Sequence, residues 1–584
     1  MRETIESVVV AFILAFLFRA FVAEAFVIPT GSMAPTLMGA HKDVYCEFCG
    51  QQYQASASSE FDSNTGAQRE DVAVASTCAT CRGLNAYDFR NNRNHSSFSG
   101  DRILVSKFDY VLSRPKRWDV FVFKYPTEAR MNYIKRLVGL PGESLLIEGG
   151  DVYTQTEDAA EWNIARKPPA KIRAMRQIVS DTDHQAAILI EQGWPSLWQP
   201  WNEQAETTAW TVQQSPEQWN AALAQAASPQ WLRYYHKFAD NAMWQRVLSG
   251  GKIEAVDPYA SQLVTDYLAY NSSILWSRDR LYDGKSLKPK IEGRTRALDV
   301  AIQQGLRLDN GNVKENDGYH WVGDLVADFD IDIASNSGQL LLDLVEFGVH
   351  FQLTVDVADG SAQLQALGSD LPPAIFGDAS SLTVQTPIRG PGKYRVEMAN
   401  VDDQIVLWVN GSEVEFEQPA EFNSRAFRSD SARRPYWQPS DPLDAAPAGI
   451  GGQNIELSVT RARVYRDIYY IAIDTNIRSS EYSDYDLNRL GPMLAALPES
   501  SGLSHVHSVG DVISAIYAHP QWWAETNLFS QRRQLQFDLE EQQYFPMGDN
   551  SAASSDARSW GDHNYVEEKF LLGKALLVFW PHTW

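Results

Sequence analysis

One apolar segment near the start of the chain constrains its fold more than any other feature. Residues 5–22 read IESVVVAFILAFLFRAFV, with Glu6 and Arg19 as the only charged side chains. Eighteen mostly apolar residues are just long enough to cross a bilayer as a helix, and long charged side chains near the ends can reach the interfaces. We therefore expect residues 1–26 to be a membrane anchor.

A cleaved secretory leader is the alternative interpretation of this segment, because Ala23-Glu24-Ala25 has the small-x-small pattern of a cleavage site. Two observations favour a retained anchor. The region before the apolar run has only Arg2 as a basic residue, and the strongest catalytic motif begins four residues beyond the site, at Pro29. The flanking charges are only a weak signal for the orientation of this segment in the membrane. The positive-inside rule compares the basic residues on its two sides, and Arg2 alone stands before it, whereas Arg19 and later basic residues lie at its other end.

The size and charge of the chain limit its architecture and its partners. At 584 residues it exceeds what a single hydrophobic core usually supports, so we expect several folded units. A formal net charge of −23 disfavours nucleic acid and anionic lipid as partners, because both would be repelled. Contact with a membrane should therefore be apolar, and we expect no nucleic-acid partner.

A serine just beyond the apolar run is the first candidate for chemistry. Residues 29–37 read PTGSMAPTL, a turn-rich segment that would display Ser32 near the membrane surface. A serine hydroxyl needs a base to become a nucleophile. None of the 11 histidines lies in a local triad signature such as G-x-S-x-G. Lys135, in YIKRLVGLPGE at residues 133–143, is the better candidate.

Four blocks of this sequence, in the same order, resemble the type I signal peptidase family. They are residues 29–37, residues 100–107 (GDRILVSK), residues 117–143 and residues 544–550 (YFPMGDN), the last continued by Ser554, Asp556, Arg558, Trp560 and Gly561. The resemblance implies a serine endopeptidase that removes N-terminal signal peptides from exported precursors. It also implies a single-pass protein of the cell membrane, with its catalytic part on the extracytoplasmic side.

The resemblance implies a catalytic dyad. Ser32 would attack the scissile carbonyl, and Lys135 would take its proton and later give it to the leaving amine. Such a lysine must be desolvated to lose its proton near neutral pH, and each unit of pKa shift corresponds to about 1.4 kcal/mol. Apolar neighbours such as Ile134 meet that requirement, and Arg136 should face the opposite side of the strand.

Supporting residues are implied by the same resemblance. The backbone N–H of Ser32 and the hydroxyl of Thr30 would bind the oxyanion. Ser554 would orient the lysine amine, while Asp556 and Arg558 would support the site from behind.

The apolar strands near the dyad are candidates for substrate binding. Their side chains either form walls of small pockets and pair with an extended peptide, or they are ordinary core. The resemblance implies Ala-x-Ala-like specificity. The candidate wall residues are Met33, Ile103, Val105, Val120 and Phe121.

Two other functions remain open. One is a catalytically silent, membrane-tethered protein that binds a glycan or another envelope partner. The other is a related Ser/Lys processing protease with a different substrate.

The four cysteines form two C-x-x-C pairs, Cys46/Cys49 and Cys78/Cys81. Two thiolates on one tight turn supply half of a tetrahedral site, so residues 43–99 resemble a zinc ribbon that binds structural zinc. Catalysis itself would need no cofactor. The alternative is a pair of disulfides, which an extracytoplasmic location would favour. A redox-active C-x-x-C pair is less favoured, because no thioredoxin-like βαβ pattern surrounds these cysteines.

A second and much larger insertion, from about residue 151 to residue 541, contains two kinds of sequence pattern. Residues 156–308 are rich in Trp, and stretches such as residues 217–223 (EQWNAAL) are typical of amphipathic helices, which predicts a helical insert. In residues 309–464, residues 400–411 (NVDDQIVLWVNG) resemble the strand-turn signature of laminin-G or concanavalin-like jelly rolls. That resemblance implies a β-sandwich, and glycan binding is one option for it. Alternating aspartates at residues 328–332 mark either a calcium site or the wet face of a sheet.

The predicted fold class is therefore mainly β. A signal-peptidase-like core would combine residues 27–42, 100–155 and 540–584, after the transmembrane helix. The inserts would be zinc-ribbon-like (43–99), helical (156–308) and jelly-roll-like (309–464), with a mixed connection at 465–539.

Overall fold

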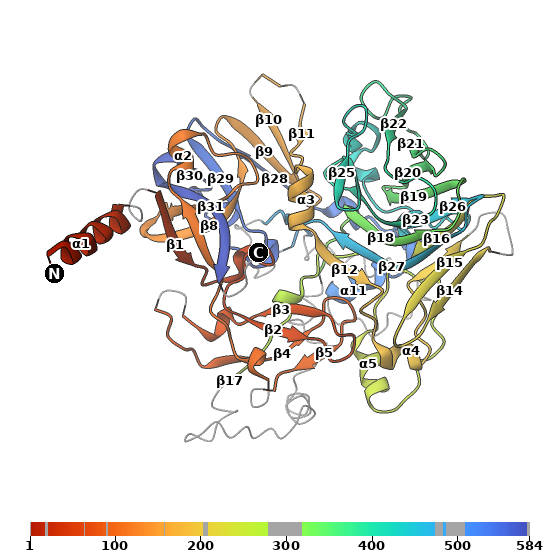
Figure 1. Ribbon diagram of the computed structural model, residues 1–584, viewed down its shortest axis with the longest axis horizontal. Coiled ribbons are helices and arrows are strands. Elements are labelled where there is room, and N and C mark those ends of the chain that lie inside the picture. The colour runs from red at the N-terminus through yellow and green to blue at the C-terminus, as the bar shows by residue number, and fades with distance from the viewer. Residues whose placement is uncertain are drawn as a thin grey trace.

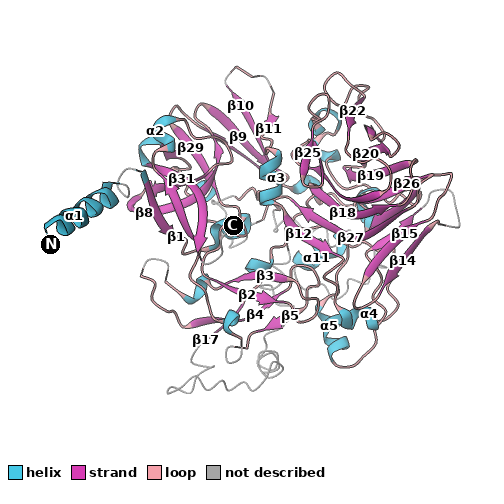
Figure 2. Cartoon of the chain, viewed as in Figure 1, coloured by secondary structure: helices cyan, strands magenta, loops and turns pink. Residues whose placement is uncertain are grey.

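The computed structural model describes residues 2–17, 22–62, 65–88, 92–156, 158–159, 161–201, 208–277, 318–473, 483–485 and 509–580. Strands dominate these residues (Figure 2), so the mainly β class predicted from the sequence is confirmed. The strands gather into two large bodies and a smaller module between them (Figure 1).

The first body brings together segments from both ends of the chain. Its sheets are antiparallel, and the larger one has seven strands. Their order is β1 (Ala23–Val27), β6 (Arg102–Ser106), β31 (Leu571–Trp580), β7 (Val120–Tyr125), β8 (Glu128–Gly139), β29 (Gln543–Met547) and β30 (Val566–Glu567). The second sheet has the order β11 (Asn163–Ile164), β10 (Asp151–Thr156), β9 (Glu143–Glu148) and β28 (Gln534–Asp538).

Strand β7 shows why these segments form a sheet covered on both faces. Its side chains alternate, as the two-residue period of a strand requires. Val120 and Val122 pack with Met33 in one cluster, whereas Phe121 and Phe123 pack in another. A run of apolar residues without polar alternation is thereby buried on both sides.

The smaller module consists of two hairpins, each with one C-x-x-C pair at its turn. Strand β2 (His41–Tyr45) pairs with β3 (Gln52–Ser56), and β4 (Asp71–Thr77) pairs with β5 (Leu84–Ala86). Strand β17 (Ile274–Ser277), from the large insertion, joins the other edge of β4. The module is therefore completed by a segment far away in the sequence.

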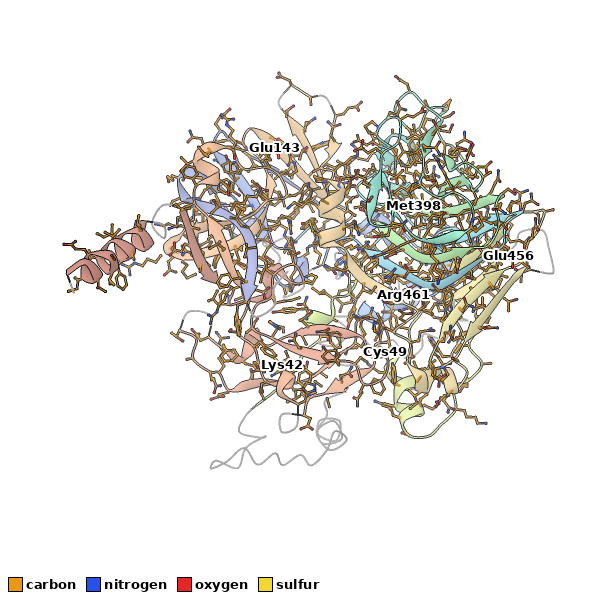
Figure 3. The ribbon with its side chains drawn as sticks, viewed as in Figure 1. Lys42, Cys49, Glu143, Met398, Glu456 and Arg461 are labelled. Atoms are coloured by element: carbon orange, nitrogen blue, oxygen red, sulfur yellow. The ribbon has the colours of Figure 1, made fainter. Side chains whose placement is uncertain are left out.

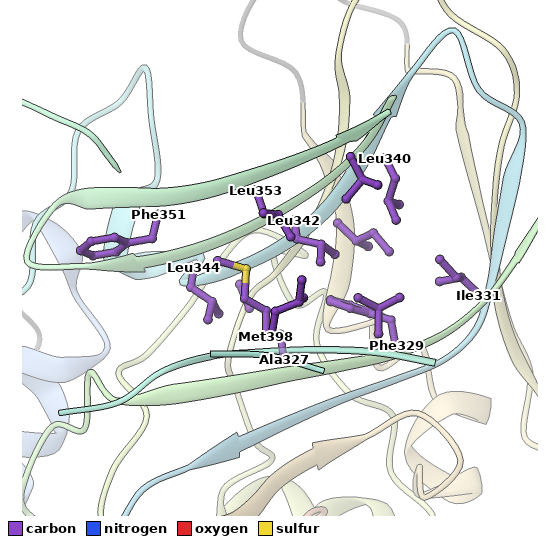
Figure 4. Packing of buried hydrophobic residues seen from close by; sticks show 14 of the residues in the cluster. Ala327, Phe329, Ile331, Leu340, Leu342, Leu344, Phe351, Leu353 and Met398 are labelled. Atoms are coloured by element: carbon purple, nitrogen blue, oxygen red, sulfur yellow. The ribbon is translucent and has the colours of Figure 1, made fainter. Parts of the chain in front are cut away.

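The second body is a sandwich of two antiparallel sheets. One has the order β14 (Trp210–Gln214), β15 (Trp219–Leu223), β27 (Leu457–Arg466), β18 (Leu325–Ile333), β23 (Gly392–Asn400), β24 (Ile405–Val409) and β25 (Ser412–Val414), with β12 (Gln177–Asp181) also on β27. The other has the order β13 (Trp198–Trp201), β16 (Gln230–Tyr234), β26 (Ala448–Gln453), β19 (Gln339–Glu346), β20 (Val349–Asp356), β21 (Ser361–Leu367) and β22 (Ser381–Gln385). Phe329, Met398 and Leu342 meet in the core between them (Figure 4).

The prediction of a helical insert at residues 156–308 is wrong for the residues that the structure describes. Residues 219–223, expected in an amphipathic helix, form strand β15, which pairs with β27. Trp219, Ala221 and Leu223 are buried in alternation, and a window this short fits both a helical and a two-residue period. Within the described part of this region, the α-helices are α3 (Pro169–Met175), α4 (Ala187–Glu191) and α5 (Asn241–Leu248). The sandwich thus begins at β12, not at residue 309.

The aspartates of β18 differ in exposure, since Asp328 is buried whereas Asp330 and Asp332 are half-buried. Asp328 is fully buried and forms ion pairs with Arg395 and Arg463, at 2.8 and 3.0 Å. Arg463 also contacts Asp330 at 2.9 Å. Buried carboxylates need such partners, because an isolated buried charge is costly.

The remaining α-helices within the described residues are α1 (Arg2–Leu17), α2 (Asp109–Leu112), α9 (Ser424–Phe427) and α11 (Val509–Tyr517). Helix α1 extends away from the first body (Figure 1). Among the residues that the structure describes, no helix has the length and apolar character needed to span a membrane. The predicted span at residues 5–22 includes residues 18–21, which lie outside the described part, and it stays a prediction.

Candidate active site

Ser32 and Lys135 lie in direct contact although 103 positions separate them. Ser32 is in the 3₁₀ turn η2 (Gly31–Met33), and Lys135 is on β8. The Lys135 Nζ lies 2.7 Å from the Ser32 Oγ. Their exposed fractions are only 4% and 7%, so the contact is shielded from water.

The surroundings of Lys135 favour its neutral form. Burial lowers the pKa of Lys135 from 10.5 to about 8, although the negative charge of Asp556 opposes the shift. Phe121 lies opposite Lys135 across the strands, and the Tyr133 ring centroid is 5.4 Å from the amine. With a pKa near 8, about a tenth of the amine is neutral at pH 7. Lys135 can therefore accept a proton from Ser32.

Asp556 and Arg558 form a buried ion pair behind the dyad, with 2.7 Å between Oδ2 and Nη2. Asp556 accepts a hydrogen bond from the Gly548 backbone N–H at 2.9 Å. Arg558 donates to the Ser551 Oγ at 2.8 Å and to the Ile471 carbonyl at 2.9 Å. The pair therefore fixes the loop after β29, which faces the nucleophile.

The other two predicted support residues are near Ser32 but not hydrogen-bonded to the dyad. Ser554 is buried, and its Oγ has no hydrogen-bond partner among the described residues. A Cβ on Gly548 would lie 2.2 Å from that Oγ and 2.3 Å from the Ser32 carbonyl oxygen, so these groups crowd together. Thr30 is exposed and makes no side-chain capping bond to the turn. Their roles remain predictions.

The predicted substrate-binding residues divide between two clusters. Met33, Ile103 and Val105 pack together, with Val120 partly buried against them. Phe121 packs in the separate cluster with Phe123 and Leu137. The first group adjoins the turn that carries Ser32, whereas Phe121 adjoins Lys135.

Sequence reasoning missed several residues that shape this site. Arg136 pairs with Asp549, whose neighbour Asn550 donates its backbone N–H to the Ser32 carbonyl at 3.1 Å. Two residues from the large insertion also reach the site: Asn271 donates a hydrogen bond to Asn550, and Tyr270 packs against Gly31 in the turn that carries Ser32. Asp549 and Asn550 lie inside a recognised block and could have been found, but no local signal marks residues 270 and 271.

The four cysteines come together as a candidate metal centre. One sulfur from each lies within 4.8 Å of the others, and no pair is joined in a disulfide. The Cys46–Cys81 and Cys49–Cys78 sulfur distances are 3.5 and 3.6 Å. Figure 3 labels Cys49 in this module, together with Lys42 on β2.

Backbone and side-chain N–H groups point at the sulfur atoms. The Gly83 N–H donates to the Cys81 sulfur at 3.4 Å, and the Asn85 amide donates to the Cys46 sulfur at 3.5 Å. N–H donors of this kind stabilise thiolates, the form in which cysteine binds zinc. The donor set and its geometry therefore fit a tetrahedral zinc ion.

Comparison of the sequence with known proteins finds similarity to signal peptidases. The sequence profile described as "Signal peptidase, peptidase S26" matches residues 1–62, 72–194 and 448–580. Signal peptidase I of Pseudomonas aeruginosa is 39% identical over 82 residues, which cover 12% of this chain and 29% of that protein. Signal peptidase I of Leptolyngbya laminosa is 38% identical over 77 residues, covering 12% and 37% respectively. The matches thus span well under half of either relative.

Among solved structures, the Caenorhabditis elegans galectin LEC-6 is similar at 10% identity over 24% of this chain and 81% of that one. The TM-score is 0.17, too low to carry an argument about the sandwich.

Proposed function

This chain belongs to the signal peptidase family, peptidase S26, and we propose that it is a membrane-bound serine endopeptidase that removes N-terminal signal peptides from exported precursors. The observation that carries the proposal is the 2.7 Å contact between the Lys135 Nζ and the Ser32 Oγ. A buried amine with a lowered pKa next to a serine hydroxyl is an arrangement suited to nucleophilic catalysis.

The reaction proceeds in two halves. Neutral Lys135 takes the Ser32 proton as the Oγ bonds to the scissile carbonyl carbon. The protonated amine then gives this proton to the leaving nitrogen as the C–N bond breaks, which leaves an acyl-enzyme. In the second half, Lys135 takes a proton from water as the water oxygen bonds to the acyl carbon, and it returns this proton to the Ser32 Oγ as the ester bond breaks, which releases the product acid.

The oxyanion of each tetrahedral intermediate requires donors that are already in place. The Ser32 backbone N–H and the Thr30 hydroxyl fill this role in the proposal. Thr30 is exposed and its side chain does not cap the turn, which is consistent with a hydroxyl available to substrate. An apolar cluster lies next to Ser32 and includes Met33, Ile103, Val105 and Val120. In the proposal, this cluster forms the surface that accepts the small side chains of an Ala-x-Ala leader end.

Anchoring in the cell membrane, with the core on the extracytoplasmic side, is part of the proposal. Helix α1 exposes large apolar side chains, including Ile5, Phe12 and Leu14, each more than 60% exposed. Further exposed apolar residues lie on α2, at Val111 and Leu112, and α2 packs against β31. Exposed apolar side chains of this kind, gathered on a helix, are typical of membrane contact.

Structural zinc in the cysteine module is also proposed. Zn–S bonds of about 2.3 Å in a tetrahedron place sulfur atoms about 3.8 Å apart, and the Cys46–Cys81 and Cys49–Cys78 sulfur distances are 3.5 and 3.6 Å. Cys46, Cys49, Cys78 and Cys81 would hold the ion and thereby join the two hairpins. The ion takes no part in peptide hydrolysis.

The decisive experiment uses the full-length protein in detergent and a precursor that ends its leader with Ala-x-Ala. Ser32→Ala and Lys135→Met should each lower turnover by about a thousandfold or more, because neither group acts without the other. Lys124→Met is the matched control, since Lys124 is exposed on the neighbouring strand β7. Full cleavage by Ser32→Ala would overturn the proposed mechanism, and cleavage of unrelated peptides alone would overturn the proposed substrate.

A further inference from the structure

Asn271, in the large insertion, makes a reciprocal pair of hydrogen bonds to the loop opposite the nucleophile. The residue ends the 3₁₀ turn η5 (Ala269–Asn271). The Asn271 Nδ2 donates to the Asn550 Oδ1 at 2.7 Å, and the Asn550 Nδ2 donates to the Asn271 Oδ1 at 2.8 Å. Both ends of each amide are used, so the pair fixes the orientation of the Asn550 side chain.

Asn550 in turn holds the backbone on both sides of the nucleophile. Its Nδ2 also donates to the Gly31 carbonyl at 3.0 Å, and its backbone N–H donates to the Ser32 carbonyl at 3.1 Å. Asn550 is only 1% exposed. A shift of its amide would therefore move the peptide unit between Gly31 and Ser32, which carries the Ser32 N–H.

The same inserted turn packs directly on Gly31. A Cβ at Gly31 would lie 2.1 Å from Cε1 of the Tyr270 ring. The Tyr270 hydroxyl donates to the Ala40 carbonyl at 3.3 Å, beyond the far end of the nucleophile loop. Tyr270 thus contacts the segment that carries Ser32 at Gly31 and at Ala40, while its neighbour Asn271 contacts Asn550.

The cysteine module anchors the turn from the other side. The Ser272 Oγ accepts from the Thr77 N–H at 2.9 Å, and the Tyr267 hydroxyl donates to the Thr77 carbonyl at 3.0 Å. Thr77 immediately precedes Cys78. The segment that presents Asn271 is therefore attached to one of the two cysteine hairpins.

We propose that Asn271 is a positioning residue for peptide hydrolysis, which acts through Asn550 to hold the Gly31–Ser32 peptide unit in its reactive place. The inference rests on the proposed function of Ser32 and Lys135. It gives the insertion a role in the active site, because displacing a reacting group by an ångström or less costs up to about a hundredfold in rate.

The test compares Asn271→Ala, Asn271→Asp, Asn550→Ala and the double variant Asn271→Ala/Asn550→Ala in the full-length protein. Asn271→Asp keeps the shape of the side chain but removes the donor to the Asn550 Oδ1. Ser273→Ala is the matched control, because it removes a 2.7 Å hydrogen bond to the Ser56 carbonyl next to the same turn without touching the nucleophile loop. Thermal unfolding is measured for every variant.

Both Asn271 variants should lower kcat about tenfold with little change in KM or in the unfolding midpoint. Ser273→Ala should keep the wild-type kcat. In the double variant, loss of Asn271 should add nothing to the loss of Asn550, because the two act in series. The isosteric Asn271→Asp carries the test if Asn271→Ala does not fold.

Four results would overturn the inference. Unchanged kcat in Asn271→Asp, with an active wild type, would overturn it while leaving the proposed function intact. So would an additive loss in the double variant, or an equal loss in Ser273→Ala, because either indicates general loosening of the turn. If the wild type shows no Ser32-dependent cleavage, the proposed function fails and this inference fails with it.

Discussion

Arg136 and Asp549 form a two-pronged ion pair in the interior of the first body. The Arg136 Nε lies 2.6 Å from the Asp549 Oδ1, and the Nη2 lies 2.5 Å from the Oδ2. Arg136 follows the proposed base Lys135, and Asp549 precedes Asn550, which contacts the nucleophile loop. One buried pair therefore ties the strand of the base to the loop that supports the nucleophile.

Asp549→Asn should destabilise the protein strongly. The side chains of the pair are at most 2% exposed, and removing one partner of a buried pair costs about 3–5 kcal/mol, because the other charge stays buried without compensation. We expect a lower unfolding midpoint for the first body in scanning calorimetry. Asp562→Asn, at an exposed position, serves as the control. An unchanged midpoint in Asp549→Asn would show that the pair does not hold the core together.

The rate of cleavage should rise with pH through an apparent pKa of about 8. Burial lowers the pKa of Lys135 to about 8, and the neutral amine is the reactive form. The neutral fraction therefore grows as pH increases, from about a tenth at pH 7 to about nine tenths at pH 9. The measurement is kcat/KM against pH with a short peptide substrate. A profile that is flat from pH 6 to 9, or that falls over this range, would argue against Lys135 as the base.

The proximity of Ser32 and Lys135 could be predicted from the sequence because each residue lies in a short block with its own pattern. Arg136 was expected to face away from Lys135, and its pairing with Asp549 agrees with that expectation. Asn271 could not be found in this way, since it reaches Asn550 across 279 positions. Its neighbours in the sequence belong to an insertion without a recognised pattern. Only the folded chain shows that contact.

The fold was predicted well where apolar residues alternate over long strands, and poorly where the strands are short. Strand β18 has nine residues with clear alternation, and the sequence identified it. Strand β15 has five, and its pattern is equally compatible with one turn and a half of helix. What makes it a strand is pairing with residues 457–459. Tertiary pairing of this kind overrides local preference.

The cysteine module should contain one zinc ion per chain, bound in the folded state. Removing it with a chelator, or by Cys46→Ser, should lower the unfolding midpoint of the protein, because binding energy at such a site is folding energy. Metal content by mass spectrometry and thermal unfolding before and after zinc is returned provide the measurement. Magnesium, which prefers oxygen ligands, is the control and should restore nothing. Two disulfides and no zinc in the purified protein would contradict the prediction.

Gly31→Ala should impair cleavage for a reason that lies in the insertion. Gly31 is not among the glycines with positive φ, so its backbone conformation does not by itself require glycine. Space does, because the added Cβ would lie 2.1 Å from the ring of Tyr270. The methyl group must then displace either the ring or the turn that carries Ser32, and we expect kcat/KM to fall by about a hundredfold.

Tyr270→Ala distinguishes this steric cause from any other. With the ring removed, the methyl group at residue 31 has room, so the added cost of Gly31→Ala should be much smaller in the Tyr270→Ala background than in the wild type. The kinetic coupling between the two changes should be about 1 kcal/mol or more, as is typical of residues in contact. Equal losses in both backgrounds would mean that Gly31 is needed for the substrate or the oxyanion, and not for the fit of the insertion against the nucleophile loop.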